Sequence, residues 1–151
     1  MPAQPLLPPE LSALPTLVLK SGAGLGGLTE GERELALALV AEVLPPGAAL
    51  SEPEINQALR LCLTREAVFL ASDAAELRRW LVDMGFWRRD GFGRRYEPCP
   101  LDELPPGRRL IVTALAAMDL ASWVAGQRAE HDARRLARRT AWAAGRSGAD
   151  G

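Results

Sequence analysis

The chain has few of the residues from which metal centres, disulfide frameworks and many catalytic sites are built. Its 151 residues include two cysteines and one histidine. Cys62 lies on an apolar helical face, Cys99 stands between two prolines, and His131 has no neighbour at metal-ligand spacing. The sequence therefore predicts no catalytic residue, no metal site and no cofactor, and we expect a protein that is not an enzyme.

Long hydrophobic runs are also lacking. The first 15 residues carry prolines where a secretory signal needs a continuous apolar helix. The longest apolar stretch, residues 110–126, is rich in alanine, is interrupted by Asp119 and is shorter than the roughly 20 residues that a membrane span needs. We therefore expect no membrane segment and a cytoplasmic location.

Lysine is almost absent, since Lys20 is the only one among 18 basic residues, and arginine makes up the rest. The formal net charge is -1, which is not typical of a protein saturated with DNA-binding charge. The charge is unevenly distributed, however, because residues 1–50 are mainly acidic and residues 101–151 are mainly basic. Any surface that binds nucleic acid must therefore be confined to a part of the chain where basic residues are in excess.

Residues 1–28 are rich in proline and glycine, which predicts a flexible arm with at most a short strand over residues 16–20. Residues 22–27 match G-x-G-x-x-G, the glycine pattern of dinucleotide sites. Such a site also needs a second parallel strand with an acidic residue about 20 residues further on. The next elements are a Pro-Pro-Gly turn and another helix, so we expect no dinucleotide there.

Three capping boxes then follow, each with a side-chain acceptor and a glutamate three residues later: Thr29–Glu32, Ser51–Glu54 and Asp73–Glu76. After each box, apolar residues recur at spacings of three and four, which predicts a helix with one buried face. Residues 48–50 have the length of one short strand before the second box.

Gly85 is suited to end the third helix in a left-handed conformation. Phe86–Asp90 and Arg94–Glu97 then flank a glycine-rich turn, which predicts a β-hairpin. The order is helix, strand, helix, helix, strand, turn, strand. The sequence thus predicts a mainly α fold with a small β-hairpin, a winged helix-turn-helix domain over residues 29–98.

A proline-rich linker is predicted at residues 99–107, followed by a helical extension at residues 108–145, as one long helix or two shorter ones. The fold class is therefore a winged helix-turn-helix plus a long C-terminal helix. The stretch Leu110–Val124 is apolar almost all round, so it must be buried against the domain or a partner. We expect this helix to join two copies of the chain in a homodimer.

Three motifs carry a resemblance to a known family: LSEPEINQAL at residues 50–59, DAAELRRWLVDMG at residues 73–85, and Arg89 with Gly93 and Tyr96. With these motifs, residues from about 32 to 98 resemble the domain of unknown function 2087, an uncharacterised bacterial family. The resemblance implies a winged-helix-like fold and a regulatory, DNA-associated setting.

Arg78 and Arg79 lie off the apolar face of the third predicted helix. In one interpretation they reach bases or phosphates in the major groove of double-stranded DNA. In the other they form ion pairs with Glu76, Asp83 or Asp90 and hold the helix to the hairpin.

The predicted wing carries four arginines, Arg88, Arg89, Arg94 and Arg95, against the single acid Asp90. Arginines that neutralise phosphates give salt-sensitive affinity for DNA. The alternative is a solvated hairpin whose charges keep an edge strand soluble. Strand alternation places only one arginine of each adjacent pair on a given face.

Two further features have a structural and a functional interpretation. Trp80, Trp87 and Phe92 could be platforms on which nucleic-acid bases stack, or parts of the core. We expect the two tryptophans in the core and Phe92, at the hairpin tip, to be exposed. Arginines over residues 128–146 form a second phosphate-binding surface or a solvated helical face, and the spacing of Glu130 and Arg134 favours the latter. The sequence thus predicts a DNA-binding winged-helix protein that regulates transcription, or alternatively a non-catalytic protein-interaction module on the same scaffold.

Overall fold

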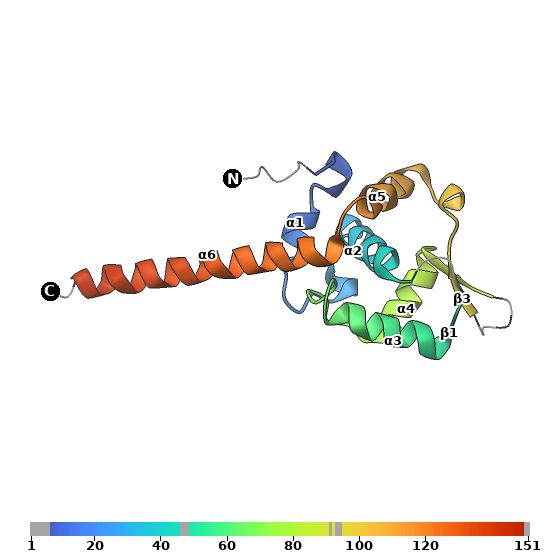
Figure 1. Cartoon of the computed structure of the whole chain (residues 1–151), viewed down its shortest axis with the longest axis horizontal. Helices are drawn as coiled ribbons and strands as arrows, with labels where there is room; N and C mark the ends of the chain where they lie inside the picture. Colours follow the sequence, from blue (N-terminus) through green and yellow to red (C-terminus); the bar gives the residue numbers. More distant parts are fainter. Residues whose placement is uncertain (1–6, 46–48, 91, 93–94, 150–151) are drawn as a thin grey trace.

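The structure is a computed structural model that describes residues 7–45, 49–90, 92 and 95–149. It is mainly helical, with one small antiparallel sheet and a long C-terminal helix that projects from the body (Figure 1). The elements are η1 (Pro9–Leu11), α1 (Leu14–Leu17), η2 (Leu25–Gly27), α2 (Glu30–Val43), β1 (Leu50–Ser51), α3 (Glu52–Leu63), α4 (Ala74–Asp83), β2 (Trp87–Arg89), β3 (Arg95–Pro98), η3 (Leu101–Glu103), α5 (Pro106–Ala116) and α6 (Leu120–Ala149).

The three predicted caps start α2, α3 and α4. The side chain of Thr29 accepts a hydrogen bond from the backbone N–H of Glu32 at 3.1 Å, and the Glu32 carboxylate accepts from Thr29 N–H. Ser51 forms the same reciprocal pair at the start of α3, and Asp73 accepts from the N–H of Glu76 at 2.8 Å before α4. Each cap satisfies backbone donors that the first helical turn leaves free.

The three strands form one antiparallel sheet in the order β1-β3-β2. Tyr96 of β3 lies opposite Leu50 of β1 and Arg89 of β2, so this residue is central in the sheet. The order α2, β1, α3, α4, β2, β3 is that of a winged helix, as the sequence predicts. The β2–β3 turn is described only in part, because residues 91, 93 and 94 lie outside the described residues.

Gly85 has a φ of +79°, the left-handed conformation that the sequence predicts for the end of α4. The chain reverses there, and the N–H of Phe86 donates to the carbonyl of Leu81 at 2.9 Å. Phe86 and Trp87 then enter the core and are almost fully buried. Gly85 therefore directs the hairpin back across α4.

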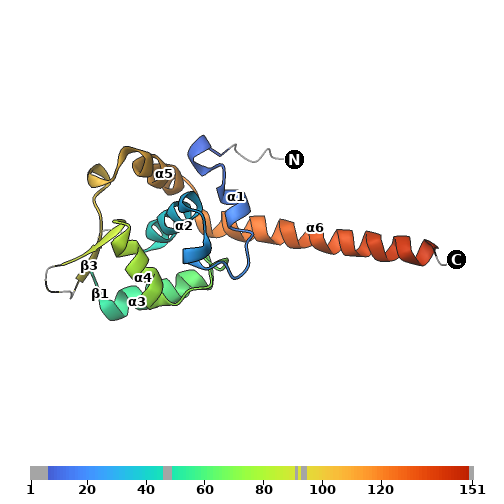
Figure 2. The same ribbon diagram turned by 180° about the vertical axis from the view of Figure 1, so that it is seen from behind.

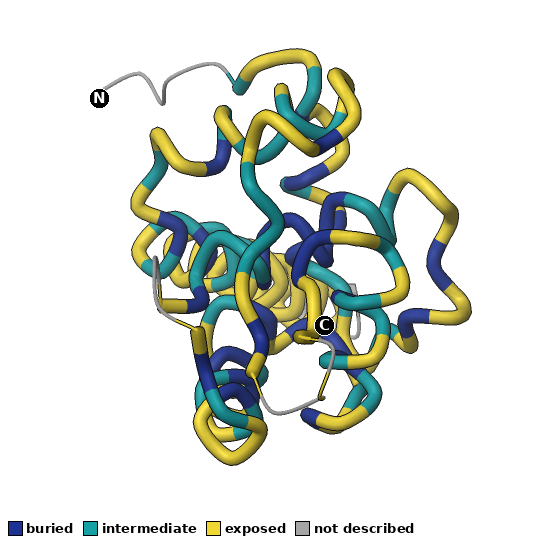
Figure 3. Tube along the Cα trace, turned by 90° about the vertical axis from the view of Figure 1, so that its right-hand side faces the viewer, coloured by how far each residue is buried: buried dark blue, intermediate teal, exposed yellow. Residues whose placement is uncertain are grey.

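A single hydrophobic cluster holds the body together, and Figure 3 shows its buried segments between the outer helices. It joins α2, α3, α4 and the sheet to residues 11–28, which precede them, and to residues 115–124, which follow them. Trp87 and Phe69 are among its largest fully buried side chains. Trp80 packs against the cluster while Phe92 is 86% exposed, as the sequence predicts for both.

Residues 7–28 differ from the predicted flexible arm. Six of their side chains are buried in the common cluster: Leu11, Leu14, Leu17, Val18, Leu25 and Leu28. Residues 16 and 17 belong to the short helix α1, so the strand predicted at 16–20 is wrong. Ala23 also pairs with the chain near Leu70, where its N–H donates to the carbonyl of Phe69 at 3.0 Å. Leucine burial outweighs the local preference of proline and glycine for irregular structure.

The C-terminal extension consists of two helices, α5 and α6, which meet at an angle of 81°. The linker before them is ordered as η3, with Leu104 buried. Leu115, Leu120 and Val124 are buried in the common cluster. No single helix in the described part of the chain is both long and apolar enough to cross a membrane.

Candidate nucleic-acid interface

α4 has one face in the core and the opposite face in solvent. Leu77 and Leu81 are fully buried, whereas Arg79 and Asp83 are exposed. In the winged-helix order, α4 occupies the place of the helix that enters the major groove. Its solvent face and the neighbouring hairpin therefore form the candidate interface.

Arg78 lies between α4, α3 and the sheet and is largely withdrawn from solvent. Its guanidinium donates a hydrogen bond to Oδ1 of Asn56, and Nη2 lies 3.3 Å from Oε1 of Glu52. It also lies over the ring of Tyr96, 5.6 Å from the centroid. Arg78 therefore has a structural role, with partners on α3 that differ from the three acids that the sequence suggested.

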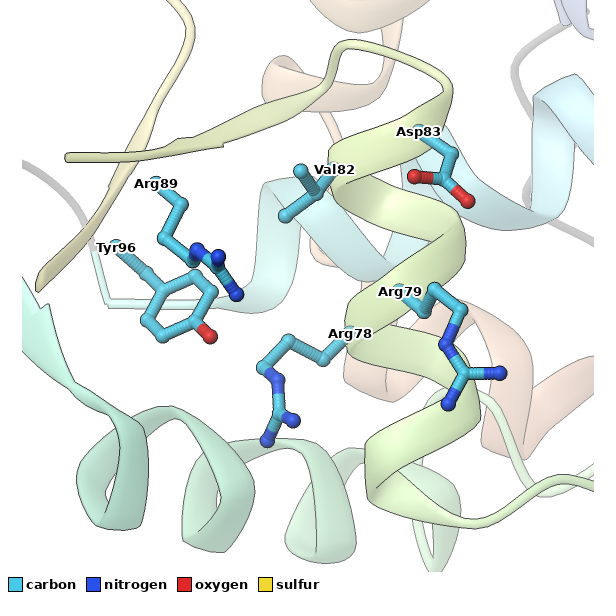
Figure 4. A pocket seen from close by; sticks show the side chains of 6 residues that line it. All are labelled: Arg78, Arg79, Val82, Asp83, Arg89 and Tyr96. Carbon is cyan, nitrogen blue, oxygen red and sulfur yellow. The ribbon is translucent and has the colours of Figure 1, made fainter. Parts of the chain in front are cut away.

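Arg79 and Arg89 are exposed, and neither forms an ion pair or a side-chain hydrogen bond with any residue that the structure describes. Together with Arg78, they line a shallow pocket of 340 Å³ between α4 and the sheet. Tyr96, Val82 and Asp83 complete the lining. Figure 4 shows Arg89 and Tyr96 extending from the sheet toward α4. This pocket brings two uncommitted positive charges to one surface.

Arg88 lies on the face of β2 opposite Arg89, and two carboxylates neutralise its charge. Its Nε is 2.8 Å from Oε1 of Glu97 on β3, and its Nη1 is 3.0 Å from Oε2 of Glu103 in η3. The hydrogen bond to Glu97 raises the pKa of the Arg88 guanidinium. Strand alternation thus separates Arg88 from Arg89, and only Arg89 faces α4.

The remaining predicted wing arginines differ in their surroundings. Arg95 is exposed, and its Nη1 donates to the backbone carbonyl of Ala49 at 3.4 Å. Arg94 lies outside the described residues. Asp90 accepts a hydrogen bond from the N–H of Phe92 at 3.2 Å, which orders the start of the turn. Arg95 thus adds positive charge near the hairpin.

Arg33 and Arg128, outside the candidate interface, bind backbone carbonyls with their side chains. Arg128 belongs to the basic run 128–146 for which the sequence offers a phosphate-binding surface or a solvated face. Arg33 donates to the carbonyls of Leu25 and Leu28 at 2.9 and 3.1 Å. Arg128 of α6 donates to those of Val18 and Lys20 at 2.8 and 3.0 Å. The partners of Arg128 lie 110 and 108 residues away in the sequence, so no local pattern reveals its role.

Arg108 connects α5 to two other elements. Its Nε lies 3.4 Å from Oε1 of Glu34 on α2, and the guanidinium donates to the carbonyl of Met84. It also lies over the ring of Phe86, 4.4 Å from the centroid. This arginine holds the end of α4 and the beginning of the hairpin in place beneath α5.

The basic half of α6 is exposed. Arg134 and Glu130 form the ion pair that their spacing suggests, with 2.5 Å between Nη2 and Oε1. Trp142 is 66% exposed and lies beneath the guanidinium of Arg146, 4.5 Å from the ring centroid. These contacts fit the interpretation of this region as a solvated helical face.

Burial disfavours the thiolate, the reactive form of cysteine, at both Cys62 and Cys99. Burial raises the pKa of the Cys62 thiol to about 12, which keeps the thiol protonated. Burial also raises the pKa of Cys99. Within the described ranges, no three residues of the metal-binding types His, Cys, Asp and Glu are grouped to hold an ion.

Residues 29–97 match a family described as an uncharacterised protein conserved in bacteria, the domain of unknown function 2087. The match covers the helices α2, α3 and α4 and the sheet, and it confirms the resemblance carried by the three sequence motifs. No curated protein and no solved structure matches the chain.

Proposed function

We propose that this chain, which carries the uncharacterised bacterial domain at residues 29–97, binds double-stranded DNA and regulates transcription without catalysing a reaction. The observation that supports this most directly is the pair Arg79 and Arg89. Both are exposed beside one pocket, and both lack an ion-pair partner in the described part of the chain.

The fold favours this use of the pocket. In a winged helix, the third helix of the domain enters the major groove and the hairpin contacts the adjacent backbone. α4 would contribute Arg79 to the groove, and β2 would contribute Arg89 to a phosphate. Arg78 would support α4 from behind through Glu52 and Asn56 and would not itself reach the DNA.

The expected affinity is modest and sensitive to salt. Each arginine that neutralises a phosphate releases about 0.9 counterions from duplex DNA. Arg79 and Arg89 are the arginines of the candidate interface without an acidic partner among the described residues, whereas the charge of Arg95 helps to lower the pKa of Glu54 after the hydrogen bonds from Ser51. Binding by a single copy of the chain therefore depends on few charges.

A second candidate function is that of a protein-interaction module. The neutralisation of Arg78 by Glu52 and of Arg88 by Glu97 and Glu103 favours it, because these charges would otherwise serve DNA. The exposed ring of Phe92 at the hairpin tip is also suited to an apolar partner surface.

The two functions are separated by titrating the full-length protein into a labelled random-sequence DNA duplex and measuring fluorescence anisotropy. DNA binding predicts affinity that falls steeply between about 50 and 200 mM salt. The double variant Arg79→Ala/Arg89→Ala should bind more weakly, and its salt slope should decrease by about two.

The matched control removes two arginines elsewhere, Arg65→Ala/Arg138→Ala. Both are exposed and form no ion pair with a described residue, and Arg138 lies on the projecting part of α6. If both double variants lose the same affinity, the binding reflects overall charge and the proposed surface is wrong. If the wild-type protein does not bind at low salt, DNA binding itself is refuted.

A further inference from the structure

α6 leaves the body of the protein after two turns. Leu120 and Val124 are buried, and Arg128 is anchored to the backbone of the N-terminal segment. Every side chain from Asp132 to Arg146 is then exposed. Figures 1 and 2 show this half of the helix projecting into solvent, with no other segment of the described residues beside it.

A projecting helix of this kind lacks the contacts that usually stabilise helices. Most helical stability in proteins comes from packing of an apolar face, and the exposed half of α6 packs no such face against the described residues. Gly145 lowers the stability of this part of the helix further, since glycine costs about 1 kcal/mol relative to alanine in a helix interior. A second helix packed alongside would supply the missing contacts.

One face of the projecting helix has the spacing of a helix-pairing seam. Small or apolar residues alternate at intervals of three and four, the heptad pattern of paired helices. We call these residues the α6 seam: Gly126, Ala129, Ala133, Leu136, Thr140 and Ala143. All six are exposed.

From Ala133 onward the α6 seam faces away from the protein's own body, whereas Ala129 lines a pocket with Thr64, Arg65 and Val68. Successive residues of a helix are about 100° apart around its axis. Measured from Val124, which points into the core, Ala129 and Ala133 lie about 140° and 180° around the helix. A second helix can therefore lie along the seam from Ala133 onward without meeting the body, and at Ala129 it passes beside the pocket that Arg65 and Val68 line.

We propose that α6 pairs with α6 of a second copy of this chain in an antiparallel arrangement, with Ala133 opposite Leu136 of the partner subunit. This register also aligns Ala129 with Thr140 of the partner subunit. It places the two bodies at opposite ends of the helix pair, each on the outer side.

The charges beside the seam fit this register. Asp132 and Arg139 flank Leu136 on one side of the seam, and both are exposed. In the proposed register, Asp132 of each copy faces Arg139 of the partner subunit, so that two equivalent ion pairs form. A C₂ dimer requires such a self-complementary surface.

Other arrangements lack this complementarity. A shift of one heptad in one direction places Asp132 opposite Asp132 of the partner subunit, and a shift in the other direction places Arg139 opposite Arg139 of the partner subunit. In a parallel pair, the same flanking positions face alanines. The antiparallel register with Ala133 opposite Leu136 of the partner subunit is therefore favoured.

This dimer element differs from the one expected from sequence. Leu115, Leu120 and Val124 of the predicted stretch Leu110–Val124 are already buried in the protein's own core. Leu110 is 57% exposed and Leu136 is 65% exposed. These two leucines therefore offer a direct comparison between α5 and α6 as the interface.

The mass of the full-length protein in solution tests the proposal without reference to DNA. Light scattering after size exclusion should give twice 16.3 kDa for the wild type. Leu136→Glu should give the monomer, because it buries a charge in the seam near Glu130 of the partner subunit. Leu110→Glu is the matched control, with the same change at a similarly exposed position, and should remain dimeric. A monomeric wild type, or a dimer lost only in Leu110→Glu, overturns the proposal.

Charge reversal tests the antiparallel register. Asp132→Arg or Arg139→Asp alone places like charges opposite each other twice and should raise the dimer dissociation constant about tenfold. An equimolar mixture of the two variants should form a heterodimer with the wild-type dissociation constant, because both ion pairs return, one with the wild-type polarity and one with the reversed polarity. If the mixture dissociates as readily as each variant alone, the register is refuted.

Discussion

The guanidinium of Arg78 and the carboxylate of Glu52 form an ion pair between α4 and α3, with 3.3 Å between Nη2 and Oε1. The neighbouring Arg79 forms no such contact with a described residue. Two adjacent arginines of the same motif therefore have different roles, and their substitution should have separable effects.

Arg78→Ala should lower the free energy of unfolding by about 1–3 kcal/mol, since it leaves Asn56 and Glu52 without their partner and removes the contact with Tyr96. Arg79→Ala should change stability by no more than about 0.5 kcal/mol. Urea denaturation monitored by circular dichroism measures both. A loss of no more than about 0.5 kcal/mol in both variants would show that the Arg78 contacts contribute little to stability.

Arg108→Ala should destabilise the protein by about 2–3 kcal/mol, because Arg108 is only 15% exposed and joins Glu34, the carbonyl of Met84 and the ring of Phe86. Arg65→Ala, which removes an exposed arginine without an ion pair among the described residues, serves as the control. Thermal unfolding of both variants should show a lower midpoint only for Arg108→Ala. An unchanged midpoint would contradict the role assigned to these contacts.

Glu103→Gln should increase affinity for DNA if the proposed function is right, since it removes one of the two carboxylates that neutralise Arg88. Asp102→Asn is the matched control, because it removes one negative charge at the adjacent residue and leaves both ion pairs of Arg88 in place. Anisotropy titrations at low salt should show tighter binding for Glu103→Gln than for Asp102→Asn. Identical affinities would mean that Arg88 does not reach the DNA even when Glu97 is its only acidic partner.

Stability should decrease above pH 9 because of Cys62. Burial raises the folded-state pKa of this thiol to about 12 from its ordinary value of 9.0, so above pH 9 the unfolded chain releases the thiol proton and the folded chain retains it. The contribution is present below pH 9 and is lost as the pH rises toward 12, at up to about 1.4 kcal/mol per pH unit. Urea denaturation at pH 8 and pH 10 should show a larger decrease for the wild type than for Cys62→Ala. The same decrease in both would assign it to other groups.

Much of the fold follows from signals that act within a few residues. Thr29 and Ser51 bind backbone donors three residues away, so their caps can be read directly from the sequence. Gly85 adopts the left-handed conformation because it has no side chain to oppose it. The apolar spacing of α3 and α4 determines which faces they bury. For these reasons the winged-helix order was predictable.

The candidate site was predictable only in part. The sequence identifies arginines on α4 and in the hairpin, but it does not distinguish Arg88, which has two carboxylate partners, from Arg89, which has none among the described residues. That distinction depends on the position of Glu103, which η3 brings against β2. Residues close in space and distant in sequence leave no periodic signal.

The sequence by itself thus determined the helices α2, α3 and α4, their caps, the turn at Gly85 and the match of residues 29–97 to the family, because each depends on local backbone chemistry or on a contiguous motif. Only the tertiary structure decided which arginines remain free and which ones bind carbonyls and carboxylates. It also placed the N-terminal segment in the core, where Arg128 reaches the carbonyl of Val18 across 110 residues of chain. Such contacts exist only after the core has brought the distant segments together, since the long-range packing of leucines decides which polar groups meet.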